Sequence, residues 1–135
     1  MAAQGRKNVH GKAGVRFKAP YTASKNKSML RNVVTDLIIY DEVKVTSGVT
    51  KELKTLADHM VTLAKQGDLA ARREAARVIR PIVIDEASGK TALDKLFAEI
   101  GPRFAARKGG YTKAYKLGAR RGDNAEVTLV RWSDK

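Results

Sequence analysis

The chain has 135 residues, enough for one domain of ordinary size with flexible ends. It carries 27 Lys and Arg against 14 Asp and Glu, and the resulting net charge of +13 favours a polyanionic partner, either nucleic acid or an anionic membrane. The lack of cysteine excludes disulfides and thiolate metal sites, and the lack of a secretory signal or an apolar run of ~18 residues predicts a cytoplasmic protein without a membrane span.

Residues 1–23 are predicted to form a basic arm that is disordered until RNA binds it, because they combine glycines and cations without apolar periodicity. The first carboxylate of the chain is Asp36, so segment 1–35 holds no acid. A solvated tail is the alternative interpretation of such a charge run. Under the RNA interpretation, the contacting cations of this region are Arg6, Lys7, Lys12, Arg16, Lys18, Lys25, Lys27 and Arg31.

A single domain is predicted over residues 24–135, and it begins with an amphipathic helix from Ser24 onward. The helix is indicated by apolar residues at three- and four-residue steps, namely Leu30, Val33, Val34, Leu37 and Ile38. A short strand follows over Glu42–Thr46, where β-branched residues alternate with polar ones.

Two further helices are predicted in the middle of the chain. Ser47 is expected to cap the first, whose apolar stripe runs from Val49 to Ala64 and which ends at Gly67. Asp68 is expected to cap the second, over residues 69–79 before Pro81. The second helix carries three arginines on one side, which either contact RNA or form a solvated face, the latter being favoured: Arg73, Arg77 and Arg80.

The run Ile82–Ile84 is too short to distinguish a strand from a connector, and we expect an extended linker there. Thr91 and Asp94 have the spacing of a capping box, which predicts a helix that buries Leu93, Leu96, Phe97 and Ile100. Gly101 and Pro102 are expected to end that helix.

Two alternating stretches, Tyr111–Leu117 and Val127–Trp132, are separated by the turn-rich segment Gly118–Asn124 and should pair as a β-hairpin. The order helix, strand, three helices and hairpin predicts an α+β fold of two layers, in which the helices cover one face of a small sheet.

Motifs for catalysis or metal binding are incomplete in this sequence. Ser88–Thr91 resemble the end of a phosphate-binding loop, but Ile84 stands where that motif needs glycine. His10 and His59 have no second His or Cys at ligand spacing. We therefore predict that the protein is not an enzyme and has no metal, no other cofactor and no small-molecule substrate.

The C-terminal third carries the strongest functional pattern, because seven cations fall between residues 103 and 121 without one acid. They are predicted to bind RNA phosphates: Arg103, Arg107, Lys108, Lys113, Lys116, Arg120 and Arg121. Tyr111 and Tyr115 either stack on bases or pack in the core, and Tyr111 is included among the candidate RNA contacts. RNA is favoured over DNA because no helix-turn-helix, zinc-finger or zipper pattern is present.

Leu96–Phe104, Gly109–Lys113 and Arg121–Ala125 resemble the bacterial large-subunit ribosomal protein seventeen family, and the resemblance extends over roughly residues 24–130. It implies the α+β fold above, binding to the large ribosomal RNA near the peptide tunnel exit, and neighbouring large-subunit proteins as partners. Family members start with a shorter N-terminal segment than residues 1–20 here, and Glu126–Val127 and Arg131–Trp132 also depart from the family pattern. The alternative function is a free-standing RNA chaperone or nucleoid-type protein.

Overall fold

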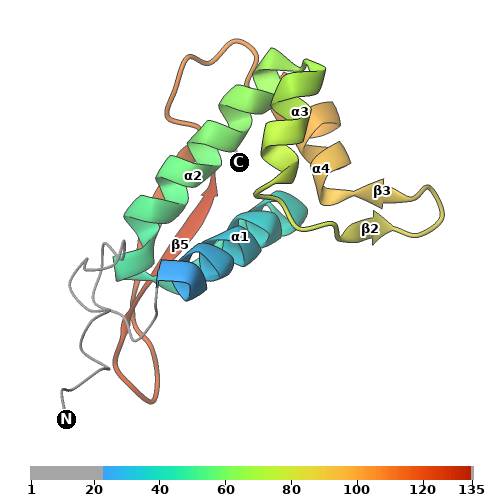
Figure 1. Ribbon diagram of the computed structural model, residues 1–135. Coiled ribbons are helices and arrows are strands. Elements are labelled where there is room, and N and C mark those ends of the chain that lie inside the picture. Colours follow the sequence, from blue (N-terminus) through green and yellow to red (C-terminus); the bar gives the residue numbers. More distant parts are fainter. Residues whose placement is uncertain (1–22, 135) are drawn as a thin grey trace.

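The computed structural model of the protein describes residues 23–134 (Figure 1). The predicted arm therefore lies outside the described residues, apart from Ala23, which begins helix α1 (Ala23–Tyr40). The buried positions of α1 include Leu30, Val34 and Leu37, so the apolar stripe read from the sequence is the face that enters the core.

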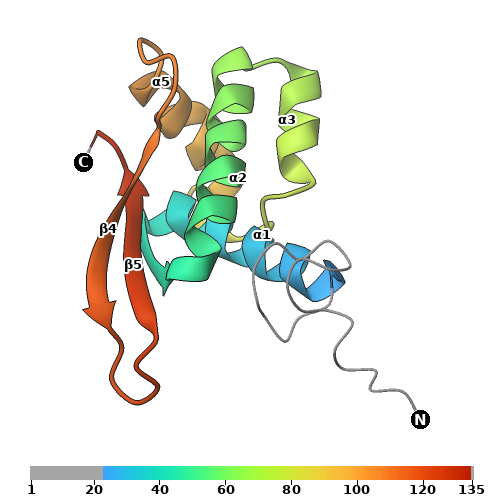
Figure 2. The same ribbon diagram turned by 90° about the vertical axis from the view of Figure 1, so that its left-hand side faces the viewer.

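The sheet has three antiparallel strands in the order β1-β5-β4. These are β1 (Glu42–Thr46), β4 (Thr112–Ala119) and β5 (Glu126–Trp132), so the predicted strand and the predicted hairpin are both confirmed. Alternate residues of the central strand β5 are buried, with Trp132 and Val130 fully covered. Figure 2 shows the helices on one side of this sheet, which is the expected two-layer α+β arrangement.

Helix α2 (Ser47–Gln66) packs against both α1 and the sheet, and its predicted apolar stripe is buried. It ends at Gly67, whose φ of 70° is left-handed and whose N–H donates to the Leu63 carbonyl at 3.2 Å. Ser47 does not cap this helix: its hydroxyl lies 2.9 Å from Thr128 Oγ1 and joins α2 to the sheet. The capping prediction for Ser47 was wrong because a strand partner competes for the same hydroxyl.

Helix α3 (Leu69–Ala76) begins as predicted, with the Asp68 carboxylate accepting a hydrogen bond from Ala71 N–H at 2.7 Å. It is three residues shorter than expected, because the chain turns at residues 77–79 and the Arg80 N–H donates to Thr35 Oγ1 of α1. Two residues of the run expected to be an extended linker, Val83 and Ile84, belong to strand β2 (Val83–Asp85), which pairs with β3 (Lys90–Thr91).

The last helical stretch comprises α4 (Ala92–Lys95), the π-helical segment η3 (Leu96–Ile100) and α5 (Gly101–Arg103). Its capping box is present, with Thr91 and Asp94 each accepting from the other's backbone N–H. Gly101 and Pro102 do not end the helix as predicted, since Gly101 N–H donates five residues back to Leu96 and the helix continues to Arg103. None of the helices within residues 23–134 is long and apolar enough to cross a membrane.

Candidate nucleic-acid interface

The C-terminal cations follow one border of the molecule from end to end. Strand β4 is one of the two edge strands of the sheet, and all its residues after Thr112 are exposed. Figure 2 shows β4 running between the loop next to α5 and the β4–β5 turn at the opposite end. We call the cations along this border the basic edge, which consists of Arg107, Lys108, Lys113, Lys116, Arg120 and Arg121.

The loop before β4 exposes Arg107 and Lys108 to solvent, while its backbone is hydrogen-bonded to α2. The Lys65 ammonium donates to the Arg107 carbonyl at 2.5 Å and to the Tyr111 hydroxyl at 3.1 Å. The side chains of Arg107 and Lys108 are exposed. The Arg107 carbonyl is thus held by Lys65 and by the Tyr111 hydroxyl, while Arg107 Nε donates to the Gly109 carbonyl at 3.3 Å on the exposed surface.

The β4–β5 turn is closed by Arg120 and Asp123. Arg120 Nε and Nη2 donate to the two Asp123 carboxylate oxygens at 3.1 and 2.5 Å, and the Ala125 N–H donates to the same carboxylate at 3.1 Å. The Arg120 hydrogen bond is the main cause that lowers the pKa of Asp123 to about 2. Arg120 thus has an acidic partner in the turn, whereas Arg121 is exposed and has none within residues 23–134.

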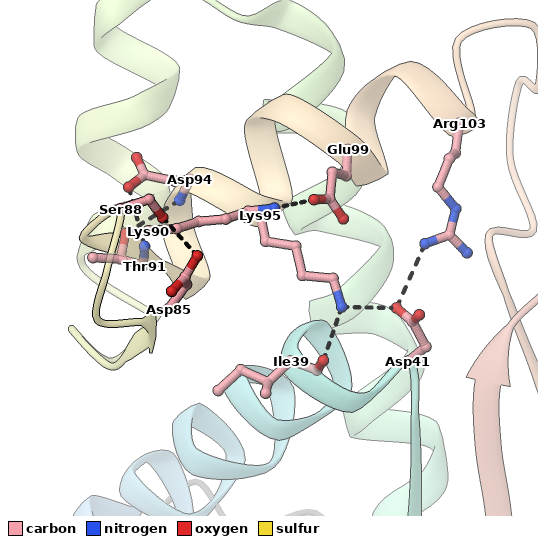
Figure 3. A network of polar contacts seen from close by, with 10 residues as sticks. All are labelled: Ile39, Asp41, Asp85, Ser88, Lys90, Thr91, Asp94, Lys95, Glu99 and Arg103. Carbon is pink, nitrogen blue, oxygen red and sulfur yellow. Dashed lines mark hydrogen bonds and ion pairs between the residues drawn. The ribbon is translucent and has the colours of Figure 1, made fainter.

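Arg103 is not part of the basic edge, although the sequence grouped it with these cations. Its guanidinium binds the Asp134 carboxylate through two hydrogen bonds of 2.7 and 2.6 Å and reaches Asp41 at 3.5 Å. The Asp134 hydrogen bond is the main cause that raises the pKa of Arg103. Figure 3 shows Arg103 and Lys95 converging on Asp41, so this arginine links the end of the chain to the α1–β1 junction.

Helix α1 places its predicted cations differently. Lys25 and Lys27 are exposed, but Arg31 Nε donates to the Val78 carbonyl at 3.0 Å and fastens α1 to the segment after α3. Arg80 turns toward α1 on the surface, where its Nε donates to Asn32 Oδ1 at 2.9 Å. The three-arginine ridge is therefore not formed, and only Arg73 and Arg77 of that set remain exposed.

The two tyrosines have different environments. Tyr111 is buried, and its ring makes an edge contact with Phe104 at 5.3 Å between centroids, so it packs in the core and offers no face to a base. Tyr115 is 44% exposed and pairs across the sheet with Leu129, on the face turned away from the helices.

Two cations that the sequence did not single out join this outer face of the sheet. The register places Lys113 opposite Arg131, and Lys44 opposite Leu129. Residues directly opposite one another in an antiparallel sheet point to the same side, so Lys44 and Arg131 lie on the same face as Lys113 and Tyr115. The alternation of β1 was visible in the sequence, but its pairing with β5 was not.

Within residues 23–134, no three His, Asp or Glu side chains come together in a way that could hold a metal ion. His59 lies on the exposed side of α2, 3.7 Å from Glu74, and His10 lies outside the described residues. The geometry therefore brings together cations, an exposed aromatic ring and an edge strand, a combination suited to binding a phosphate backbone and stacking a base.

Comparisons with known proteins agree with the resemblance noted in the sequence. Residues 29–132 match the family model described as Ribosomal protein L17. A relative named large ribosomal subunit protein bL17, from Shouchella clausii (strain KSM-K16), is 48% identical over 111 residues, which cover 82% of this chain and 92% of the relative. Because the family model spans most of the chain and this relative is covered almost end to end, the chain belongs to the ribosomal protein L17 family.

Proposed function

We propose that the chain is a structural constituent of the large ribosomal subunit of a bacterium, where it binds the large ribosomal RNA near the peptide tunnel exit. Membership of the L17 family and the similarity to a protein named for the large subunit support the assembly. The position near the exit is what the family resemblance implies. On this proposal the protein works in the cytoplasm, beside other large-subunit proteins, and contributes no catalytic residue.

The basic edge is the observation that carries RNA binding. An eight-residue strand extends for about 26 Å at ~3.3 Å per residue, a length over which an RNA strand presents several phosphates. Lys113 and Arg121 have no acidic partner within the described residues, so a phosphate meets cations that no carboxylate already neutralises. An edge strand also leaves one row of backbone groups open to hydrogen bonding.

A free-standing RNA chaperone would carry a similar charge without a fixed site. Sedimentation of the tagged full-length chain from bacterial lysate separates the two functions. We expect the protein to stay in the large-subunit peak through moderate salt, because a folded docking surface adds contacts beyond charge. Loss of the protein from that peak at moderate salt, with retained binding to unrelated RNA, would favour the chaperone instead.

The contribution of the basic edge is tested by the double variant Lys113→Gln/Arg121→Gln. Each lost phosphate contact should make the slope of log affinity against log salt shallower by about 0.7 to 0.9, so two lost contacts give about 1.4 to 1.8. Filter binding of the variant to large-subunit RNA at several salt concentrations measures this slope.

The matched control is Lys51→Gln/Arg73→Gln, which also removes one lysine and one arginine but from the exposed surfaces of α2 and α3. We expect the control to keep the slope of the parent protein. Equal slopes for both double variants would show that the basic edge is an ordinary solvated surface.

A further inference from the structure

A small hairpin that projects from the helical layer has a surface unlike the rest of the molecule. Strands β2 and β3 form this hairpin, which extends away from the helices in Figure 1. Ile82, Val83 and Ile84 are 42, 49 and 37% exposed, and they are the only three consecutive large apolar residues that the described chain leaves exposed. Val83 and Ile84 lie where the register between β2 and β3 shifts, and both side chains leave apolar surface uncovered.

The hairpin also has an uncovered edge. Strand β2 has β3 as its neighbour on one side and no strand on the other among residues 23–134. A two-stranded hairpin is marginal by itself, and an edge strand offers its backbone N–H and C=O groups to an added strand. The exposed apolar run and the open edge of β2 therefore overlap at Val83 and Ile84.

Its charge is opposite to that of the whole chain. Between Pro81 and Gly89 the only charged residues are Asp85 and Glu86, both exposed, in a protein with a net charge of +13. Lys90 of β3 is the cation of the hairpin itself: it stands opposite Asp85 in the register and pairs with Glu99, so residues 82–91 keep a net charge of −1. Carboxylates next to apolar side chains repel a phosphate backbone and complement a surface that carries cations and apolar groups.

Hydrogen bonds order both the base and the turn of the hairpin. The Ala92 N–H donates to the Ile82 carbonyl at 3.0 Å, and Asp85 shapes the turn by accepting from Ala87 N–H at 3.1 Å and Ser88 Oγ at 3.0 Å. The capping box of Thr91 and Asp94 follows directly, as Figure 3 shows. Preorganisation of this kind lowers the entropic cost of binding a partner.

We propose that the β2–β3 hairpin is a docking element for a second protein, whose basic segment packs apolar side chains on Ile82, Val83 and Ile84 and places cations beside Asp85 and Glu86. The inference rests on the proposed function, since it takes the partner from among the proteins of the large subunit. It assigns the hairpin to protein contact and leaves RNA contact to the basic edge.

The test uses the full-length chain with the photo-cross-linker p-benzoylphenylalanine in place of Val83, incorporated into large subunits in bacterial cells. Large subunits are purified by sedimentation, irradiated and digested with ribonuclease, and the joined peptides are identified by mass spectrometry. We expect an adduct with another large-subunit protein, at a peptide that contains Lys or Arg next to apolar residues. The same cross-linker at Leu69, which is 62% exposed on α3, is the control for accessibility.

A charge-reversed variant tests the role of the acids. Glu86→Lys should lower the yield of the adduct at position 83 by about tenfold, because a like charge then faces the partner's cations. Glu74→Lys makes the same change on the exposed side of α3 and should leave the yield as it was.

Four results would overturn the proposal: an adduct with RNA, an adduct with a second copy of this chain, a partner peptide without cations, or a yield no higher than at Leu69. Failure of the proposed function is recognised separately, because the parent chain would then be missing from the large-subunit peak before any irradiation.

Discussion

Asp123 is the residue whose ionisation is most strongly displaced in the described part of the chain. Its pKa is lowered to about 2, chiefly by the hydrogen bond from Arg120. Because its pKa is lowered, the Asp123 carboxylate contributes its full stabilisation to the turn at any pH above the ordinary pKa of an aspartate, near 3.8. This stabilisation is lost as the pH falls through the lowered pKa of about 2. We expect an NMR titration to find Asp123 ionised until near pH 2.

The variant Arg120→Gln should bring the Asp123 midpoint back toward its ordinary value, because it removes the main cause of the shift. Arg121→Gln removes the neighbouring cation, which does not bond to Asp123, and should leave the midpoint in place. An unchanged midpoint in Arg120→Gln would contradict the ion pair that closes the turn.

At the scale of elements, the approach of the last helical stretch to α2 depends on Gly101. A Cβ at this position would lie 3.1 to 3.3 Å from Ala64, against both its backbone and its side chain. Two packed helices cannot move apart without opening the core, so we expect Gly101→Ala to lower the free energy of unfolding by about 1 to 3 kcal/mol. Denaturant unfolding measures this difference.

Gly109→Ala is the matched control, because a Cβ there meets nothing within 4 Å. It should change the free energy of unfolding by less than about 0.5 kcal/mol. Equal stabilities of the two variants would mean that the helices separate easily, and that Gly101 has no packing role.

The whole molecule carries a net charge of +13, which opposes its compact state through self-repulsion. Raising the salt concentration from about 50 mM to about 500 mM screens this repulsion, so we expect the Tm of the free protein to rise by about 5 °C. Trp132 is the only tryptophan and is fully buried, so its fluorescence reports unfolding. The double variant Lys113→Gln/Arg121→Gln lowers the net charge by two, so its Tm should rise less with salt than that of the parent protein. A Tm that falls as salt is added would contradict the self-repulsion.

Much of the local structure could be predicted from the sequence, because periodicity, caps and turns depend on neighbours within a few residues. The apolar stripes of α1 and α2, the Asp68 cap, the capping box of Thr91 and Asp94 and the β4–β5 hairpin all follow from such spacing. The acid-free C-terminal block was likewise visible as charge. For the candidate interface, the sequence therefore identified most of the cations but not their geometry.

Only the tertiary structure decided how each charged or polar side chain is used. Arg103 and Arg31 bond to groups 31 and 47 residues away, and Ser47 turns to a strand 81 residues away. The pairing of β1 with β5 brings Lys44 and Arg131 to the face of Tyr115, while Tyr111 goes into the core. The sequence by itself determined the elements and the distribution of charge, because both are local properties. Which cations remain exposed and unpaired depends on contacts between distant segments, which exist only once the chain has folded.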